Sequence, residues 1–213
     1  KGKALVVSGS NDVSVQVLVN AINNMLGSYG ATIDLQNHCN LRQGSDAEFD
    51  ALLTELQAGQ VAALFVVGCN PAYSYPDAKR VSDAVKDAGV SVAFVTSENE
   101  TSKLCQYALP TSWYLEAWGD AEPYAGYYSL QQPTIQPIFK TRQFQDNLLK
   151  WMGDNRTYHL YLKDYWRNNL LKMGEGAAFE QKWVKILEEG VYNPKMTAAE
   201  MAVEPVMAAY AKE

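Results

Sequence analysis

The chain has 213 residues, a mass of 23.7 kDa and a formal net charge of −6, with 47% hydrophobic and 20% charged residues. This composition is typical of a folded globular protein and excludes an intrinsically disordered chain. No run of eighteen apolar residues is present, so the sequence predicts no membrane-spanning segment. The acidic balance, with a pI of about 5.0, argues against a surface that binds nucleic acid.

Three cysteines, Cys39, Cys69 and Cys105, stand far apart in the sequence. No C-x-x-C pair and no Cys–His pair at zinc spacing is present, so we expect no metal site and no iron–sulfur ligation in this stretch. The odd number argues against a disulfide framework. The sequence begins with Lys1-Gly2-Lys3 and shows neither an initiator Met nor a signal peptide. We interpret this start as that of a mature chain or of a segment from a longer one.

The first half of the sequence alternates between expected strands and helices. Continuous apolar runs predict strands over Ala4–Ser8, Thr32–Leu35, Val61–Val67 and Ser91–Thr96. Periodic apolar residues behind capping residues predict helices over residues 13–26, 46–57 and 77–88. Such alternation is typical of right-handed βαβ units on a parallel sheet. We therefore predict an α/β fold, with residues 1–110 forming a Rossmann-like, doubly wound domain.

The remaining sequence divides into two further parts. Residues 111–139 contain seven aromatic residues but no Lys or Arg, which is too aromatic for a linker. We expect an ordered aromatic loop there, packed on a partner surface or a pocket. From residue 140 onward, aromatic and aliphatic residues recur at helical spacing, which predicts a helical tail over residues 140–213 with a last helix near Met196–Tyr210.

The best candidate for a ligand-binding loop is Gly68-Cys69-Asn70-Pro71. It follows a buried strand and precedes a helix, which is where open α/β sheets bind ligands. The same residues also suit a plain turn with a helix start, so both interpretations stay open. The earlier turn Gly9–Asp12 lacks the G-x-G-x-x-G and phosphate-loop patterns, and Asp12 would repel phosphate.

Other chemically interesting residues carry no catalytic pattern. Cys69 is either a thiol activated beside a helix start or a small buried apolar group. His38 next to Cys39 does not make a catalytic dyad, and His159 stands among aromatic residues where packing is the simpler role. A solvated or interface loop is likewise the simpler interpretation of the acidic residues Glu116, Asp120 and Glu122. We therefore predict no catalytic residue and no metal ligand in this segment.

A longer pattern resembles a known superfamily. The strand Leu64–Val67 and its Gly68-Cys69-Asn70-Pro71 loop are followed by Tyr75-Pro76-Asp77, Glu100-Thr101, Tyr107-Ala108-Leu109-Pro110, Leu115-Glu116 and Gly119. This order resembles the third, Rossmann-like domain of molybdopterin oxidoreductases of the dimethyl-sulfoxide-reductase superfamily. The resemblance implies that Gly68, Asn70 and Glu116 would line the guanine-dinucleotide half of a cofactor, if such a site is retained.

A narrower resemblance covers about residues 2–153. The stretch Leu115-Glu116-Ala117-Trp118-Gly119-Asp120-Ala121, with Gly126 and Gln131–Phe139 after it, resembles the large iron–sulfur, molybdopterin-like subunit of alternative complex III. That complex is membrane-bound and oxidises quinol, and its molybdopterin site is vacant. Cys105-Gln106 also departs from the Ala-Asp that molybdenum enzymes tend to have before the Leu-Pro strand.

The narrower resemblance implies a structural, cofactor-free domain that is not itself catalytic. Its subunit would carry iron–sulfur clusters in another domain and support electron transfer from quinol to cytochrome c or a terminal oxidase. The implied partners are a cytochrome c subunit and a membrane quinol-oxidising subunit. The implied location is the periplasmic face of a bacterial inner membrane, peripheral within the complex.

Two alternatives stay open at this point. One is a segment of an active molybdopterin-guanine-dinucleotide reductase of the polysulfide or tetrathionate type, with Gly68, Asn70 and Glu116 on the cofactor. The other is an independent α/β module that binds a nucleotide, against which the missing glycine pattern counts. Stoichiometric molybdenum would favour the first alternative, and tight binding of ATP or NAD would favour the second.

Overall fold

The computed structural model describes residues 1–41 and 44–194. The chain divides into two compact units. Among the described residues, one unit contains 1–41, 121–129 and 192–194, and the other contains 44–120 and 130–191. The expected last helix near Met196–Tyr210 lies outside the described residues, and the expected domain boundaries at 110 and 139 remain predictions.

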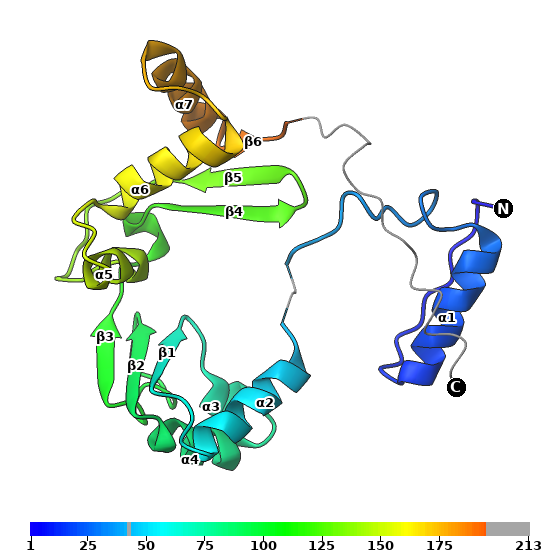
Figure 1. The fold of residues 1–213 in the computed structure, drawn as a ribbon, viewed down its shortest axis with the longest axis horizontal. Helices are drawn as coiled ribbons and strands as arrows, with labels where there is room; N and C mark the ends of the chain where they lie inside the picture. The colour runs from blue at the N-terminus through cyan, green and yellow to red at the C-terminus, as the bar shows by residue number, and fades with distance from the viewer. Residues whose placement is uncertain (42–43, 195–213) are drawn as a thin grey trace. The chain divides into compact units, whose positions relative to one another are not determined.

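A parallel sheet of three strands forms the centre of the larger unit. Its strands β1 (Ala63–Val67), β2 (Val90–Val95) and β3 (Tyr107–Pro110) lie in the order β1-β2-β3. All three run in the same direction, with Val67 opposite Phe94 and Val95 opposite Pro110 (Figure 1). Continuous apolar residues suit such strands because both faces of the sheet are covered. The predicted α/β class with a parallel sheet is confirmed.

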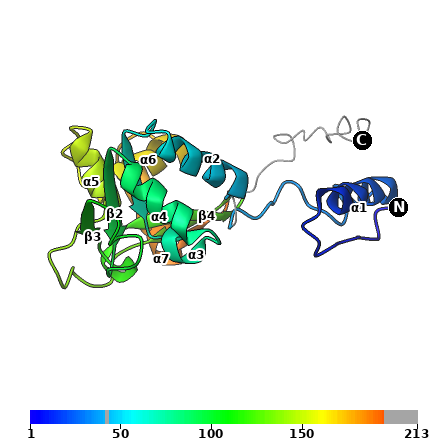
Figure 2. The same cartoon turned by 90° about the horizontal axis from the view of Figure 1, so that it is seen from below.

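Helices cover both faces of this sheet. Helices α2 (Asp46–Gln57) and α4 (Ala78–Asp87) lie side by side and bury Leu53, Leu56, Val81, Ala84 and Val85 in one cluster with Leu64 of β1 (Figure 2). Side chains alternate along a strand, so Phe65 and Phe94 face the other way. There Phe94 contacts Phe144 and Trp151 of helix α5 (Phe144–Trp151), with ring centroids 4.8 and 6.0 Å apart.

The C-terminal part of the larger unit is helical, as predicted. Helix α6 (Tyr158–Tyr165) continues into the π-helical turn η2 (Trp166–Leu170), and helix α7 (Ala177–Glu189) follows. Trp166 is fully buried and meets Trp183 of α7 edge to face at 5.9 Å. Its indole Nε1–H donates to the Asp120 carboxylate at 2.8 Å, which joins this helical core to the chain that follows β3.

Part of the segment expected to be an aromatic loop is a β-hairpin. Strands β4 (Gly119–Tyr124) and β5 (Tyr127–Gln131) belong to a second sheet with the order β4-β5-β6, where β6 is Val191–Tyr192. Gly126, at φ 73°, forms the turn, and its N–H donates to the Glu122 carboxylate at 2.7 Å. The turn needs a residue that tolerates positive φ, and glycine supplies it.

The smaller unit is built around helix α1 (Val13–Leu26). The predicted helix ends are confirmed, because Asp12 caps the first turn by accepting from the Val15 N–H and Gly27 ends the helix at φ 68°. The predicted strands over Ala4–Ser8 and Thr32–Leu35 are wrong. Residues 4–8 lie instead beside α1, where polar helix side chains take the place of a neighbouring strand, and Ile33 forms only an isolated bridge with Tyr29.

Candidate functional site

The candidate site lies at the edge of the parallel sheet where all three strands end. β1 leads into the 68–71 loop and the short helix α3 (Pro71–Ser74). β2 and β3 lead into residues 96–101 and 111–116, which therefore start from the same edge. In open α/β sheets this edge forms the ligand crevice, so the side chains here decide whether a ligand is held.

Gly68 redirects the chain at the end of β1. It has a φ of 62°, in the left-handed region, and its N–H donates to the carbonyl oxygen of Phe94 at 3.3 Å. A Cβ at this position would meet open space, so a larger residue would suffer backbone strain and not a steric clash. The role of Gly68 in this structure is therefore to form the turn, with its N–H paired to β2.

Asn70 joins the loops that follow β1 and β2. Its Oδ1 accepts hydrogen bonds from the Thr101 N–H at 3.1 Å and the Thr101 hydroxyl at 2.7 Å. Its Nδ2 donates to the Glu100 carboxylate at 2.6 Å. Thr101 is fully buried, and its Oγ1 also accepts from the Ala72 N–H at 3.0 Å. The polar atoms of the Asn70 side chain are therefore engaged with neighbouring protein groups.

Glu100 adds a negative charge to this edge. The hydrogen bond from Asn70, followed by one from the Glu100 backbone, lowers the pKa of the Glu100 carboxyl below its ordinary value. Glu100 is therefore ionised at neutral pH, and it is exposed, as is Glu98 nearby in the sequence. The Glu100 carboxylate beside the loop disfavours a phosphate group at this position, because like charges repel.

Glu116 has a comparable internal role after β3. It ends the short 3-10 turn η1 (Tyr114–Glu116), where its Oε2 accepts from the Trp113 N–H at 3.1 Å. Its Oε1 accepts from the Ile138 N–H at 3.0 Å. The carboxylate thus joins the turn after β3 to the segment that follows β5. Two charge-assisted bonds to backbone N–H groups give this carboxylate a structural function.

Of the three expected cofactor residues, the structure brings two into one loop. Gly68 and Asn70 lie together, whereas no hydrogen bond in the described part of the chain joins Glu116 to either of them. The role of Thr101 as the buried partner of Asn70 was not predicted. The sequence contains a local signal for this turn, because Asn and Ser are common turn residues. In the structure, Asn99 and Ser102 each accept a hydrogen bond from the backbone N–H of the other and thereby fix the turn.

The acidic residues after β3 each have a separate partner. Asp120 accepts from the Trp166 indole, and Glu122 accepts from the Gly126 N–H. Together with Glu116, they accept four hydrogen bonds from backbone or indole N–H groups. These contacts favour the interpretation of the acidic residues as structural.

A stacked pair that the sequence did not reveal lies between this region and α6. The rings of Trp118 and His159 are nearly parallel, with centroids 3.9 Å apart and an interplanar angle of 11°. Gln143 holds the backbone of Trp118 by accepting from its N–H at 3.1 Å and donating to its carbonyl at 2.7 Å. Partial burial first, and then the charge of Lys163, lowers the pKa of His159 from its ordinary 6.5.

The cysteines show no arrangement for metal binding. Cys39 and Cys69 are exposed, and Cys105 is partly buried, which raises the pKa of its thiol. Across residues 1–41 and 44–194, no group of three or more His, Cys, Asp or Glu side chains is placed to hold a metal ion. No helix in that part of the chain is both long and apolar enough to cross a membrane.

Comparison with known proteins identifies distant similarity. No family model matches the chain. The chain is 32% identical over 95 residues to the menaquinone reductase, molybdopterin-binding-like subunit of Nitratidesulfovibrio vulgaris, which covers 43% of this chain and 14% of that protein. Among solved structures, acetylene hydratase from Pelobacter acetylenicus matches 49% of this chain and 15% of its own, with a TM-score of 0.42 and 18% identity. The resemblance seen in the sequence is therefore supported in part, by similarity over 95 residues to a molybdopterin-binding-like subunit.

The Asn70 contacts predict a measurable loss of stability on substitution. Asn70→Ala leaves the buried Thr101 without the acceptor for its N–H and hydroxyl, which should lower the free energy of unfolding by about 1–3 kcal/mol. Cys69→Ser, at the exposed neighbouring position, should change it by less than about 0.5 kcal/mol. Urea unfolding of both variants checks this, and equal stabilities would contradict the structural role of Asn70.

The Trp118–His159 stack predicts a dependence of stability on pH. The folded state holds the pKa of His159 below 6.5, so between that lowered pKa and 6.5 the unfolded state binds more protons. The free energy of unfolding should therefore fall as the pH decreases through 6.5. His159→Gln should flatten this slope relative to the unsubstituted chain. Chemical unfolding from pH 7.5 to pH 5 measures both slopes.

Proposed function

We propose that this chain is a structural, cofactor-free molybdopterin-enzyme-like domain of the iron–sulfur subunit of a membrane-bound quinol oxidoreductase of the alternative complex III type. Its role is to support electron transfer from quinol to cytochrome c or a terminal oxidase, with the redox groups carried elsewhere. The similarity to a subunit named as menaquinone reductase supports membership in a membrane oxidoreductase complex. Because the chain spans 14% of the length of that relative, the activity of the whole assembly is part of the proposal.

The cofactor-free part of the proposal rests on the hydrogen bonds of the expected cofactor residues, all of which are made to other groups of this chain. The Gly68 N–H is bonded to β2, Asn70 is bonded to Glu100 and Thr101, and both carboxylate oxygens of Glu116 accept backbone N–H groups. A pterin dinucleotide would have to displace these contacts and place its phosphates near Glu100. These contacts support the proposal of a cofactor-free domain.

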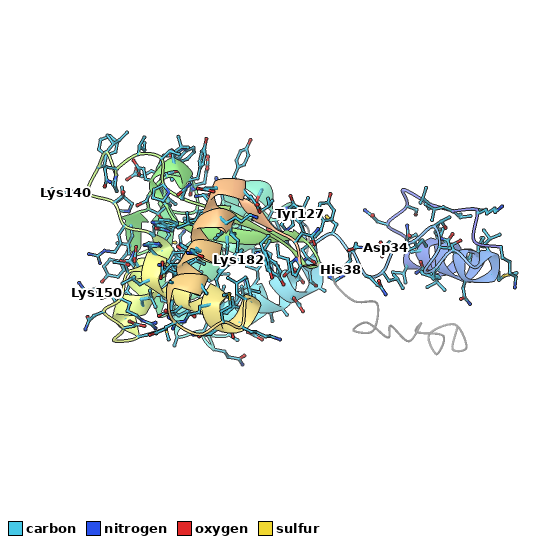
Figure 3. All side chains as sticks on the ribbon, turned by 90° about the horizontal axis from the view of Figure 1, so that it is seen from above. Asp34, His38, Tyr127, Lys140, Lys150 and Lys182 are labelled. Atoms are coloured by element: carbon cyan, nitrogen blue, oxygen red, sulfur yellow. The ribbon has the colours of Figure 1, made fainter. Side chains whose placement is uncertain are left out.

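An exposed apolar surface supports a role in assembly. It is formed by two segments of the larger unit and consists of Trp113, Tyr114, Leu115, Ile135, Ile138 and Phe139, which are 36–76% exposed. The Leu115 carbonyl accepts from the Thr134 and Ile135 N–H groups at 2.8 and 3.2 Å, so the two segments are held together. Lys140, labelled in Figure 3, directly follows Phe139 at the end of the second segment. Exposed aromatic side chains on a fixed backbone are typical of protein interfaces.

We take the partners of this 113–139 apolar surface to be other subunits of the complex, including a cytochrome c subunit and a membrane quinol-oxidising subunit. The position would be peripheral, on the periplasmic face of a bacterial inner membrane. Iron–sulfur clusters would lie in another part of the same subunit. This arrangement gives the domain a scaffold function, because it would position the cluster-bearing part next to its redox partners.

Metal and pterin analysis of the purified protein tests the cofactor-free role. We expect molybdenum far below one atom per chain and no pterin fluorescence after oxidative release, since the polar groups of the sheet edge are already paired. A molybdenum-loaded relative measured in parallel is the control. Stoichiometric molybdenum together with pterin would contradict the proposal and favour an active molybdopterin reductase.

Substitutions in the apolar surface test the assembly role. Phe139→Ala and Trp113→Ala each remove an exposed ring that we expect to be buried by a partner subunit, so each should weaken co-purification of that subunit by about thirtyfold, as for a 2 kcal/mol hot spot. Tyr73→Ala, at a 75% exposed ring on α3, is the matched control and should have no effect. Unchanged recovery of all subunits with the Phe139 and Trp113 variants would refute the interface.

A further inference from the structure

The two segments that form the 113–139 apolar surface are joined to each other by polar contacts. A hydrogen bond of 3.1 Å links the hydroxyls of Ser112 and Thr141, which flank the two segments. Between them, the Leu115 carbonyl accepts from the N–H groups of Thr134 and Ile135. These contacts use backbone and hydroxyl groups, so the apolar side chains of the surface take no part in holding the segments together.

One side chain, that of Glu116, bonds to the backbone of both segments. Its Oε2 accepts from the Trp113 N–H at 3.1 Å, and its Oε1 accepts from the Ile138 N–H at 3.0 Å. Ile138 directly precedes Phe139, so the carboxylate fixes the backbone from which the exposed rings of Trp113 and Phe139 project. A surface that is fixed before binding loses less conformational entropy when a partner covers it.

A second polar side chain supports the same turn through backbone acceptors. The Gln131 Nε2 donates to the carbonyls of Tyr114 and Ala117 at 2.6 and 3.1 Å. Glu116 thus binds N–H groups of this region, and Gln131 binds its carbonyl groups. Both side chains are directed to the backbone, and together they organise the turn that carries Tyr114.

The charge of the two segments is also confined to this carboxylate. Residues 113–116 and 134–139 contain Glu116 and no other charged residue. Because both oxygens of Glu116 are bonded to backbone N–H groups, its charge is already stabilised inside the turn. Burying a charged group of a partner against such a surface would leave that charge without a counter-charge, which is costly. The surface therefore favours a partner patch that is apolar and uncharged.

We propose that Glu116 is the positioning residue of the 113–139 apolar surface, and that this surface binds an uncharged apolar patch of a partner subunit. The proposal rests on the assembly role proposed above, since it concerns the same surface. Glu116 acts through the backbone of Trp113 and Ile138 and does not itself need to touch the partner. The residue that the sequence resemblance implies for a cofactor thereby has a role in assembly.

Substitutions of Glu116 test the positioning role. Glu116→Ala removes both acceptors, so amide exchange at Trp113 and Ile138 should rise and recovery of the partner subunit should fall, each by about tenfold. Glu116→Gln keeps one oxygen acceptor, and both readouts should be intermediate. Glu122→Ala is the matched control, because it removes a comparable bond to the Gly126 N–H in the hairpin turn, and both readouts should stay unchanged.

The two readouts separate this inference from the proposed function. Amide hydrogen exchange is measured on the full purified chain and needs no partner, whereas recovery is measured on the assembled complex. Unchanged exchange in Glu116→Ala would overturn the positioning role. Faster exchange with full recovery would also overturn it, and the proposed function would stand if Phe139→Ala still loses the partner. If Phe139→Ala keeps the partner as well, the interface and this inference both fail.

Salt tests the chemistry of the partner patch. Recovery of the partner subunit with the unsubstituted chain should be no lower at about 1 M salt than at about 0.1 M, because a contact without exposed charges is not weakened by screening. Loss of the partner at the higher concentration would overturn the assignment of an uncharged patch.

Discussion

The structure of the sheet edge depends on the hydrogen bonds of the Asn70 side-chain amide. One side chain accepts two hydrogen bonds from Thr101 and donates one to Glu100, so it fixes the loops after β1 and β2 against each other. The same contacts occupy the polar groups with which a ligand at this edge would form hydrogen bonds. A partly buried hydrogen-bond network of this kind rigidifies the fold when all its polar groups are paired. The Asn70 side chain therefore bonds to protein groups at the edge where open α/β sheets bind ligands.

Much of the secondary structure of the larger unit could be predicted from local sequence. The apolar runs that became β1 and β2, and the Ser45 cap of α2, were predicted because strands and helix starts depend on nearby residues. The 68–71 loop was also predicted as the site. The partners of its side chains were not, because Thr101 lies 31 residues from Asn70 and Ile138 lies 22 residues from Glu116. Sequence patterns carry little information on pairings at such separations.

The wrong prediction of a strand over Ala4–Ser8 has a specific physical cause. Its residues have high strand propensity, but propensity decides little unless another backbone completes the ladder. In the smaller unit the side chains of Asn23, Gln16 and Ser28 supply hydrogen bonds on one edge instead. Asn23 bonds both the N–H and the carbonyl of Val6, 17 residues away, and a local sequence pattern does not reveal such a pairing.

The bond between Trp166 and Asp120 has a consequence for the order in which the larger unit folds. It connects groups 46 residues apart, and the chain between them includes the hairpin and two helices. Closing so long a loop costs chain entropy before any contact is gained, whereas α6 and η2 need only neighbouring residues. The α2–α4 layer is likewise more local. We therefore expect the Trp166 indole to dock onto the Asp120 carboxylate only after α6 and η2 have formed.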